Sequence, residues 1–311
     1  MHFSKPLILL AGLESLAQAA IFSAEADKDP SVWGRPSTSS PVVVASEDKT
    51  HRRVVRGRFR SRQTGWNPRA DLAGPLKEVW DHTLETYNNG QVFSFKNYGW
   101  DQLEANNGAL NYCVRWESDT LVSQAKRDEI ATVVNQQYQK WFNYLYGYDG
   151  FPYTNISVNV VGWAVKDKSL LEGSTDGLDI YTDVDSEGIP QCAESCGRFF
   201  NQGGDYSGCA GGAARHYDQS LWLTDGMGGG AGGDWGQRFG TEYFLQTLGD
   251  EDIEILLHEM GHTFGLDDFY DWKPTGIKSF VMLAGAARGV TEFDGWMLRN
   301  WWYELSRERG W

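Results

Sequence analysis

The chain has 311 residues, of which 41% are hydrophobic and 14% aromatic, a composition that favours a folded protein with a buried core. This length allows one large domain or two ordinary ones. The formal net charge of −14 makes the chain a poor ligand for phosphate backbones, so the composition argues against nucleic-acid binding. Beyond the N-terminus no apolar run reaches the roughly 18 residues that a transmembrane helix needs, and we expect no membrane span.

The first 19 residues have the pattern of a secretory signal peptide. Lys5 supplies the basic start, residues 7–13 are apolar or small, and Ala17-Gln18-Ala19 offers a small-residue cleavage site. The alternative is a plain N-terminal helix, since Glu14 interrupts the apolar stretch. The pattern predicts a secreted, extracellular protein.

Residues 20–70 form a basic segment in front of an acidic one. Pro, Ser and Thr are frequent over 30–50, and eight Lys and Arg side chains follow between positions 49 and 69. Residues 71–311 carry 36 acidic and 17 basic side chains, a net charge of −19. A cationic pro-segment that covers an acidic cleft until it is removed fits this contrast, and Arg52-Arg53 resembles a dibasic processing site. The alternative is a solvated linker before a folded domain over 71–311.

Four cysteines support the extracellular prediction. They are Cys113, Cys192, Cys196 and Cys209, an even number that favours disulfides in an oxidising compartment. Three pairings are open, and the sequence does not choose among them. The CxxxC pair at 192 and 196 has no nearby His or second Cys pair that would complete a zinc site. Asn155-Ile156-Ser157 is a glycosylation sequon that matters if the chain is secreted.

Local patterns predict a mixture of strands and helices along the domain. Alternating and β-branched segments predict strands over 91–95, 111–116, 156–165, 178–182 and 220–224. Apolar residues at helical spacing predict one long amphipathic helix between about 120 and 146, with Gly147 as its stop. Seven glycines between 226 and 236 predict a mobile rim or lid.

The clearest chemical signal is the HExxH pattern at residues 258–262. His258 and His262 are one turn apart on a helix, so both imidazoles can bind the same Zn²⁺ ion. Glu259 beside them can act as the general base on a metal-bound water and pass the proton to the leaving amine. The helix itself is predicted by an apolar stripe of Ile253, Leu256, Leu257, Met260 and Phe264.

The motif extends to HExxHxxGxxD, which suggests a third metal ligand. Gly265 can end the helix in a left-handed conformation and return the chain toward the metal, where Asp268 arrives. A carboxylate is an accepted third zinc ligand, and a fourth position left open to water distinguishes catalytic from structural sites. His82 and His216 are the competing third ligands, because the other two histidines lie in the signal and the basic segment.

Residues 250–300 resemble the metzincin clan of zinc endopeptidases. The motif with Asp268 is similar to snapalysin-type and immune inhibitor A-type secreted peptidases, and residues 265–271 resemble the GLPDxYD of the latter. Asp267 replaces the usual Pro. Residues 279–285 resemble the Met turn, which implies that Met282 lies under the metal. No Met-x-Tyr follows, so the usual transition-state-stabilising tyrosine is unassigned and Tyr270 is a candidate.

The resemblance also implies a fold and a substrate class. It implies an α+β, α/β-like metzincin fold: a twisted, mostly parallel sheet with a long helix and an active-site helix. A small C-terminal subdomain would follow from about residue 266, with the Met turn and a last helix. Thr291 and Asp294 have the spacing of a capping box at the start of that helix. The implied activity is hydrolysis of protein or peptide substrates; the sequence gives neither a cleavage preference nor an oligomeric state.

A second metal signal lies at residues 183–194. Asp183, Asp185, Glu187 and Glu194 approximate the spacing of a calcium loop, although Pro190 and Cys192 fall inside it. The alternative is a solvated acidic turn closed by a disulfide. Two other functions therefore stand beside the peptidase: a calcium-dependent, dockerin-like binding module, and a metzincin-shaped binding protein with an inactive site. The intact Glu259 argues against the inactive form.

Overall fold

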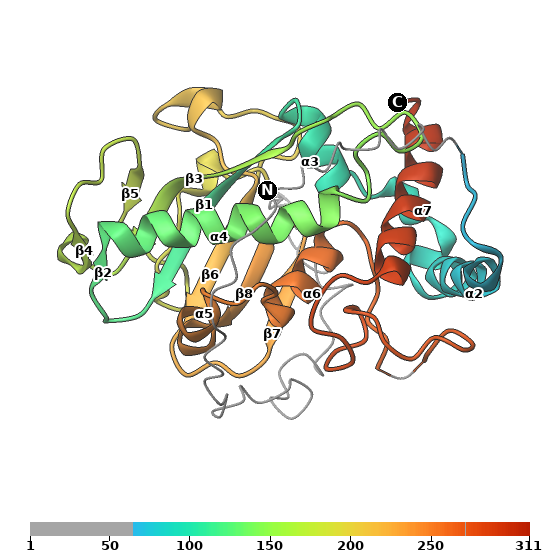
Figure 1. The fold of residues 1–311 in the computed structure, drawn as a ribbon. Helices are drawn as coiled ribbons and strands as arrows, with labels where there is room; N and C mark the ends of the chain where they lie inside the picture. Colours follow the sequence, from blue (N-terminus) through green and yellow to red (C-terminus); the bar gives the residue numbers. More distant parts are fainter. Residues whose placement is uncertain (1–64, 271) are drawn as a thin grey trace, which may run out of the picture.

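A computed structural model describes residues 65–270 and 272–311 as a mixed α and β fold around one six-stranded sheet (Figure 1). The strands run parallel except for the edge strand β7, which is antiparallel to β8. The order across the sheet is β5 (Asp179–Tyr181), β3 (Ser157–Val165), β1 (Ala109–Glu117), β6 (Gln219–Thr224), β8 (Gly236–Gly240) and β7 (Gly230–Gly233). A separate parallel pair joins β2 (Val122–Ser123) and β4 (Leu171–Glu172). The expected mixed fold with a mostly parallel sheet is confirmed.

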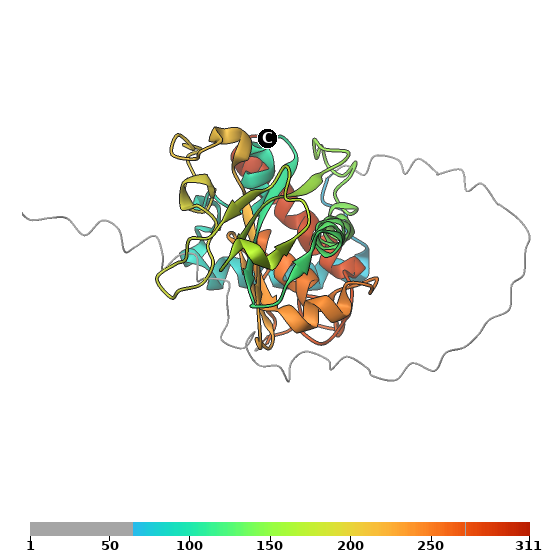
Figure 2. The same cartoon turned by 90° about the vertical axis from the view of Figure 1, so that its left-hand side faces the viewer.

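Six α-helices surround the sheet in the described part of the chain. They are α2 (Ala70–Thr86), α3 (Gly99–Ala105), α4 (Gln124–Phe142), α5 (Thr241–Thr247), α6 (Glu254–Thr263) and α7 (Glu292–Arg309). The long α4 crosses one face, with α6 beside it, and Figure 2 shows the segment between β5 and β6 on the opposite face. α2 and α7 lie together at one end, where Trp80 meets Trp301 edge to face at 5.3 Å. None of the described helices is long and apolar enough to cross a membrane.

Strand β1 shows how the sequence separates the two faces. Tyr112, Val114 and Trp116 point into the main core beneath α4 and α6. Cys113, between them, points to a smaller cluster on the other face, as the period of two in a strand requires. All four cysteines belong to that cluster: Cys113–Cys192 attaches the long β5–β6 connection to the back of the sheet, and Cys196–Cys209 closes a loop within the connection.

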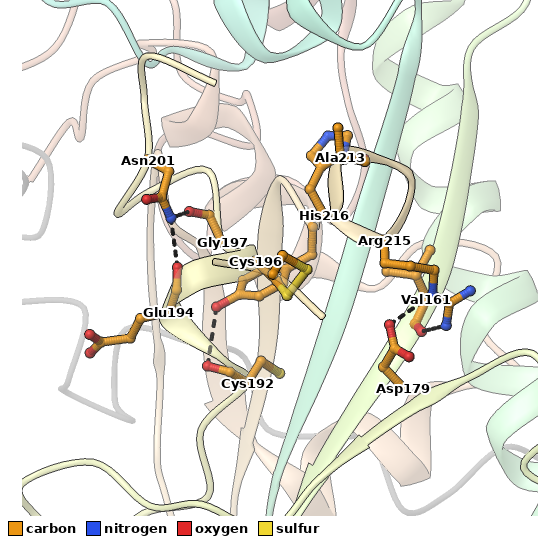
Figure 3. Close-up of a disulfide and its surroundings, with 12 residues drawn as sticks. Val161, Asp179, Cys192, Glu194, Cys196, Gly197, Asn201, Ala213, Arg215 and His216 are labelled. Carbon is orange, nitrogen blue, oxygen red and sulfur yellow. Dashed lines mark hydrogen bonds and ion pairs between the residues drawn. A yellow bond between two sulfur atoms is a disulfide. The ribbon is translucent and has the colours of Figure 1, made fainter. Parts of the chain in front are cut away.

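The disulfides are Cys113–Cys192 and Cys196–Cys209. The prediction that the cysteines are oxidised is confirmed. Figure 3 shows how hydrogen bonds reinforce this region. The Asn201 amide donates to the carbonyls of Glu194 and Gly197 at 2.7 and 2.9 Å. The nearby Arg215 guanidinium binds the Asp179 carboxylate at 2.8 Å.

The glycine-rich segment differs most from its prediction. The edge strand β7 lies in the middle of it and β8 begins at its last residue, Gly236, so the prediction of a mobile rim or lid is wrong. A Cβ added to Gly232 would lie 2.5 Å from the Glu259 carbonyl oxygen, and one on Gly230 would lie 2.6 Å from Ile255. The glycines therefore serve close packing of β7 on α6 rather than flexibility.

The first described part of the chain departs from the sequence prediction at one element. The expected strand over 91–95 is instead a 3₁₀ turn at Val92–Ser94. Gly65 and Trp66 already pack on the domain: Trp66 meets Trp296 at 5.7 Å, and the Gly65 N–H donates to Asp149. The folded part therefore begins by residue 65. The signal peptide over 1–19, the processing site at 52–53 and most of segment 20–70 lie outside the described residues.

Candidate metal centre

His258, His262 and Asp268 converge on one buried point. The two imidazoles are almost completely buried on α6, and Asp268 reaches them from the loop after it. His258 Nε2 lies 2.9 Å from Asp268 Oδ1 and 3.1 Å from His262 Nε2, and His262 Nε2 lies 3.3 Å from the same carboxylate oxygen. Four ligands at about 2.0–2.1 Å from a tetrahedral zinc ion lie about 3.3 Å from one another. Two imidazoles and one carboxylate with these separations fit such an ion.

The other nitrogen of each imidazole is fixed by a backbone carbonyl. His258 Nδ1 donates to the Val281 carbonyl at 2.9 Å, and His262 Nδ1 donates to the Leu266 carbonyl at 2.8 Å. These bonds place the proton on Nδ1 and leave both Nε2 lone pairs directed at the common point. Carbonyl contacts of this kind orient metal-binding histidines and raise their basicity.

Gly265 returns the chain to the site as predicted. Its φ of +85° is left-handed, and the following Leu266 N–H donates back to the Gly261 carbonyl at 3.2 Å. Any side chain on Gly265 would also meet the Trp301 ring, which its Cβ would approach to 2.8 Å. A left-handed residue with no side chain is therefore required to bring Asp268 under α6.

Neither competing histidine lies in the metal group. His82, on α2, stacks on Trp272 at 4.4 Å and approaches Asp267 rather than the imidazoles, with 3.5 Å between Nε2 and Oδ2. His216 contacts Asp218 at 3.2 Å in the β5–β6 connection. Asp267, where the resembled family has Pro, accepts the Asp268 backbone N–H at 2.8 Å and so helps to orient the third ligand.

The charges of the group favour a cation. Burial alone would lower the pKa of His258, but the hydrogen bond and charge of Asp268 outweigh it and raise that pKa to about 9. Burial works against ionisation of Asp268 as well, yet the two imidazoles hold its pKa well below the usual value. The carboxylate stays ionised, so the group attracts either protons or a metal ion.

Met282 lies directly beneath the helix that carries the histidines. A Cβ on Gly261 would be 2.2 Å from the Met282 sulfur, so the helix needs glycine where it rests on this side chain. Asp294 holds the turn itself: its carboxylate accepts the backbone N–H groups of Val281 at 2.9 Å and Met282 at 3.2 Å. The expected capping box with Thr291 is present, but this second role of Asp294 was not predicted. Its burial raises the pKa of its carboxyl.

Glu259 borders the group from the neighbouring helical position. Its carboxylate is fully buried, and its Oε2 lies 3.9 Å from His262 Nε2. A Cβ on Gly230 would be 2.3 Å from its Oε1, so β7 forms the wall behind it. Tyr270 is partly buried on the loop two residues after Asp268, and its role as a stabilising group stays a prediction.

The proposed calcium ligands do not converge. In the described part of the chain, His258, His262 and Asp268 are the single set of three metal-ligating side chains with atoms within 4.8 Å of one another. Asp185 instead binds Arg115 at 2.6 Å and accepts the N–H of Glu187 at 2.9 Å. Glu194 accepts the side-chain amide of Gln191, and Asp183 is exposed. These contacts correspond to the acidic turn rather than to a calcium loop.

Comparison with known proteins gives no assignment: no family model matches the chain, and no curated protein matches it.

Proposed function

We propose that the chain is a secreted zinc-dependent endopeptidase of the metzincin type. The observation that carries this proposal is the buried His258, His262 and Asp268 group with Glu259 beside it. Two imidazoles favour zinc over the oxygen-seeking Mg²⁺ and Ca²⁺. Two disulfides are compatible with an extracellular location.

Each residue of the group has a role in this proposal. The two histidines and Asp268 would hold the ion, leaving the open position that catalytic zinc sites keep. When bound, such an ion acidifies water and polarises a carbonyl group. The Glu259 carboxylate, buried beside the two histidines, is placed to take up a proton and to return it to the leaving amine. The edge strand β7, which backs Glu259, offers backbone groups that an extended peptide could pair with.

The test combines metal analysis with one substitution. The purified protein should contain about one zinc per chain and cleave an unfolded protein substrate. Glu259→Gln should keep the zinc and lose activity by a factor on the order of 10²–10⁴, as expected when a general base is removed. Glu251→Gln is the matched control, because Glu251 is exposed just before the same helix and should leave activity unchanged.

Other outcomes would favour the other functions. Bound zinc with no cleavage by the wild type would indicate a binding protein built on a peptidase-like site. No bound zinc would contradict the proposal, and bound calcium would return attention to the 183–194 turn.

A further inference from the structure

A buried polar network connects the metal-binding helix to the middle of the sheet. Its members come from six elements and are all fully buried: Gln102 (α3), Tyr112 (β1), Tyr138 (α4), Gln219 (β6), Gln237 (β8) and Thr263 (α6). Burying this many polar groups is costly unless each one is hydrogen-bonded. The sequence gives no sign of it, because its members are scattered over 160 positions of otherwise apolar core.

The centre of the network is satisfied by short hydrogen bonds. The Tyr112 hydroxyl contacts the Tyr138 hydroxyl at 2.7 Å and the Gln237 side-chain oxygen at 2.8 Å. Tyr138 donates to the Gln219 oxygen at 2.7 Å, and Gln219 donates to Gln102 at 2.7 Å. Burial raises the pKa of Tyr138 to about 12, so this hydroxyl stays protonated and can donate.

Thr263 is the point where the network reaches α6. Its hydroxyl accepts the Gln237 amide on β8 at 2.9 Å and donates to the Gly233 carbonyl on β7 at 2.8 Å. Thr263 directly follows His262, and β7 is the strand whose glycines back Glu259. One hydroxyl thus connects the turn that carries a metal ligand to the edge strand β7 and to its neighbour β8.

A network of this kind restricts the helix more than apolar packing does. Apolar side chains tolerate small rotations and shifts of a helix, whereas directed hydrogen bonds are satisfied in one arrangement. We propose that Thr263 is a positioning residue, which fixes the rotation and height of α6 on the sheet so that His258, His262 and Asp268 meet. This inference rests on the proposed metal site and adds a residue that does not touch the ion.

The test compares zinc affinity in variants of similar stability. Thr263→Val removes the hydroxyl and keeps the shape, and we expect zinc binding, measured by competition with a chelator, to weaken about ten- to a hundredfold. Thr263→Ser restores the hydroxyl and should bind zinc close to wild type. Thr247→Val is the matched control: Thr247 is also buried in a helix and donates to the Tyr243 carbonyl at 2.9 Å, but it is on α5. It should lower the melting temperature without changing zinc affinity.

A second readout tests geometry directly. Co²⁺ in place of zinc absorbs visible light with an intensity that depends on tetrahedral coordination, and Thr263→Val should change this spectrum while Thr247→Val should not. If Thr263→Val does not fold, Thr263→Ala, which leaves room for a water molecule, replaces it. Wild-type zinc affinity and cobalt spectrum in the folded valine or alanine variant would overturn the positioning role. Failure of the wild type itself to bind zinc would instead contradict the proposed function.

Discussion

Asp294 offers the sharpest test of how the metal centre is supported from a distance. Its Oδ2 accepts three donors, the N–H groups of Val281 and Thr291 and the Thr291 hydroxyl, at 2.6 to 2.9 Å. Its Oδ1 accepts the Met282 N–H at 3.2 Å. The carbonyl of Val281 in turn accepts His258 Nδ1. A perturbation at Asp294 should therefore reach the metal ligand through the turn.

The substitution Asp294→Asn replaces one of the two carboxylate oxygens with an NH₂ group, which donates hydrogen bonds and cannot accept them. An amide that keeps its oxygen at the Oδ2 position retains three bonds and turns its NH₂ group toward the Met282 N–H, so a charge-assisted bond becomes a contact between two donors. Losing a hydrogen bond to a charged group costs about 1.5–3 kcal/mol. We expect the free energy of unfolding, measured by urea titration, to fall by about this amount, and zinc affinity to fall about tenfold or more through the displaced turn.

The control uses the other acidic residue in the first turn of α7. Glu292 is exposed and pairs with Arg69 at 2.8 Å, so Glu292→Gln should cost at most about 1 kcal/mol and leave zinc affinity unchanged. If Asp294→Asn is as stable as Glu292→Gln and binds zinc as tightly, then Asp294 does not support the turn and the reasoning fails.

Three further predictions test packing, charge and covalent constraint. Gly232→Ala should cost about 1–3 kcal/mol of unfolding free energy and reduce activity, since its Cβ would meet the α6 backbone at 2.5 Å, whereas Gly249→Ala, in open space, should be neutral. Burial raises the pKa of Asp234 to about 6 from 3.8, so the folded state keeps a proton that the unfolded state releases, and stability falls as pH rises through this interval. The unfolding free energy of Asp234→Asn, relative to that of wild type, should therefore rise by about 2–3 kcal/mol between pH 4 and pH 7 in a series of denaturant titrations. Replacing both Cys196 and Cys209 by Ser should cost about 3 kcal/mol, and equal melting temperatures would contradict this.

The parts of the site that the sequence predicted are those fixed by local geometry. His258 and His262 share a face because a helix repeats every 3.6 residues, and the apolar stripe around them was enough to predict that helix. Gly265 and Asp268 follow within one short loop, so the return of the chain could be inferred from one left-handed residue. Spacing alone did not exclude His82 and His216, because their positions depend on contacts between elements far apart in the chain.

The glycine-rich segment shows the opposite case. Seven glycines in eleven residues have no pattern of side chains, so composition predicted flexibility. Gly230 and Gly232 are instead buried where a strand meets α6, and their lack of a side chain is explained by atoms of residues 255 and 259. A requirement imposed by a distant partner leaves no trace in the local pattern. The same reason applies to the disulfide pairing, which joins Cys113 on β1 to Cys192 across 79 positions.

The two histidines consequently depend on the fold to different degrees. His262 is oriented by Leu266, four residues away, through a turn that Gly265 sets locally. His258 is oriented by Val281, 23 residues away, in a turn held by Asp294 of α7. Loosening of α7 should therefore disturb His258 before His262, because α7 holds the His258 turn by hydrogen bonds to Asp294, whereas it meets the His262 turn through the packing of Trp301 on Gly265. The C-terminal helix is thus part of the metal centre in an energetic sense, although none of its residues would touch the ion.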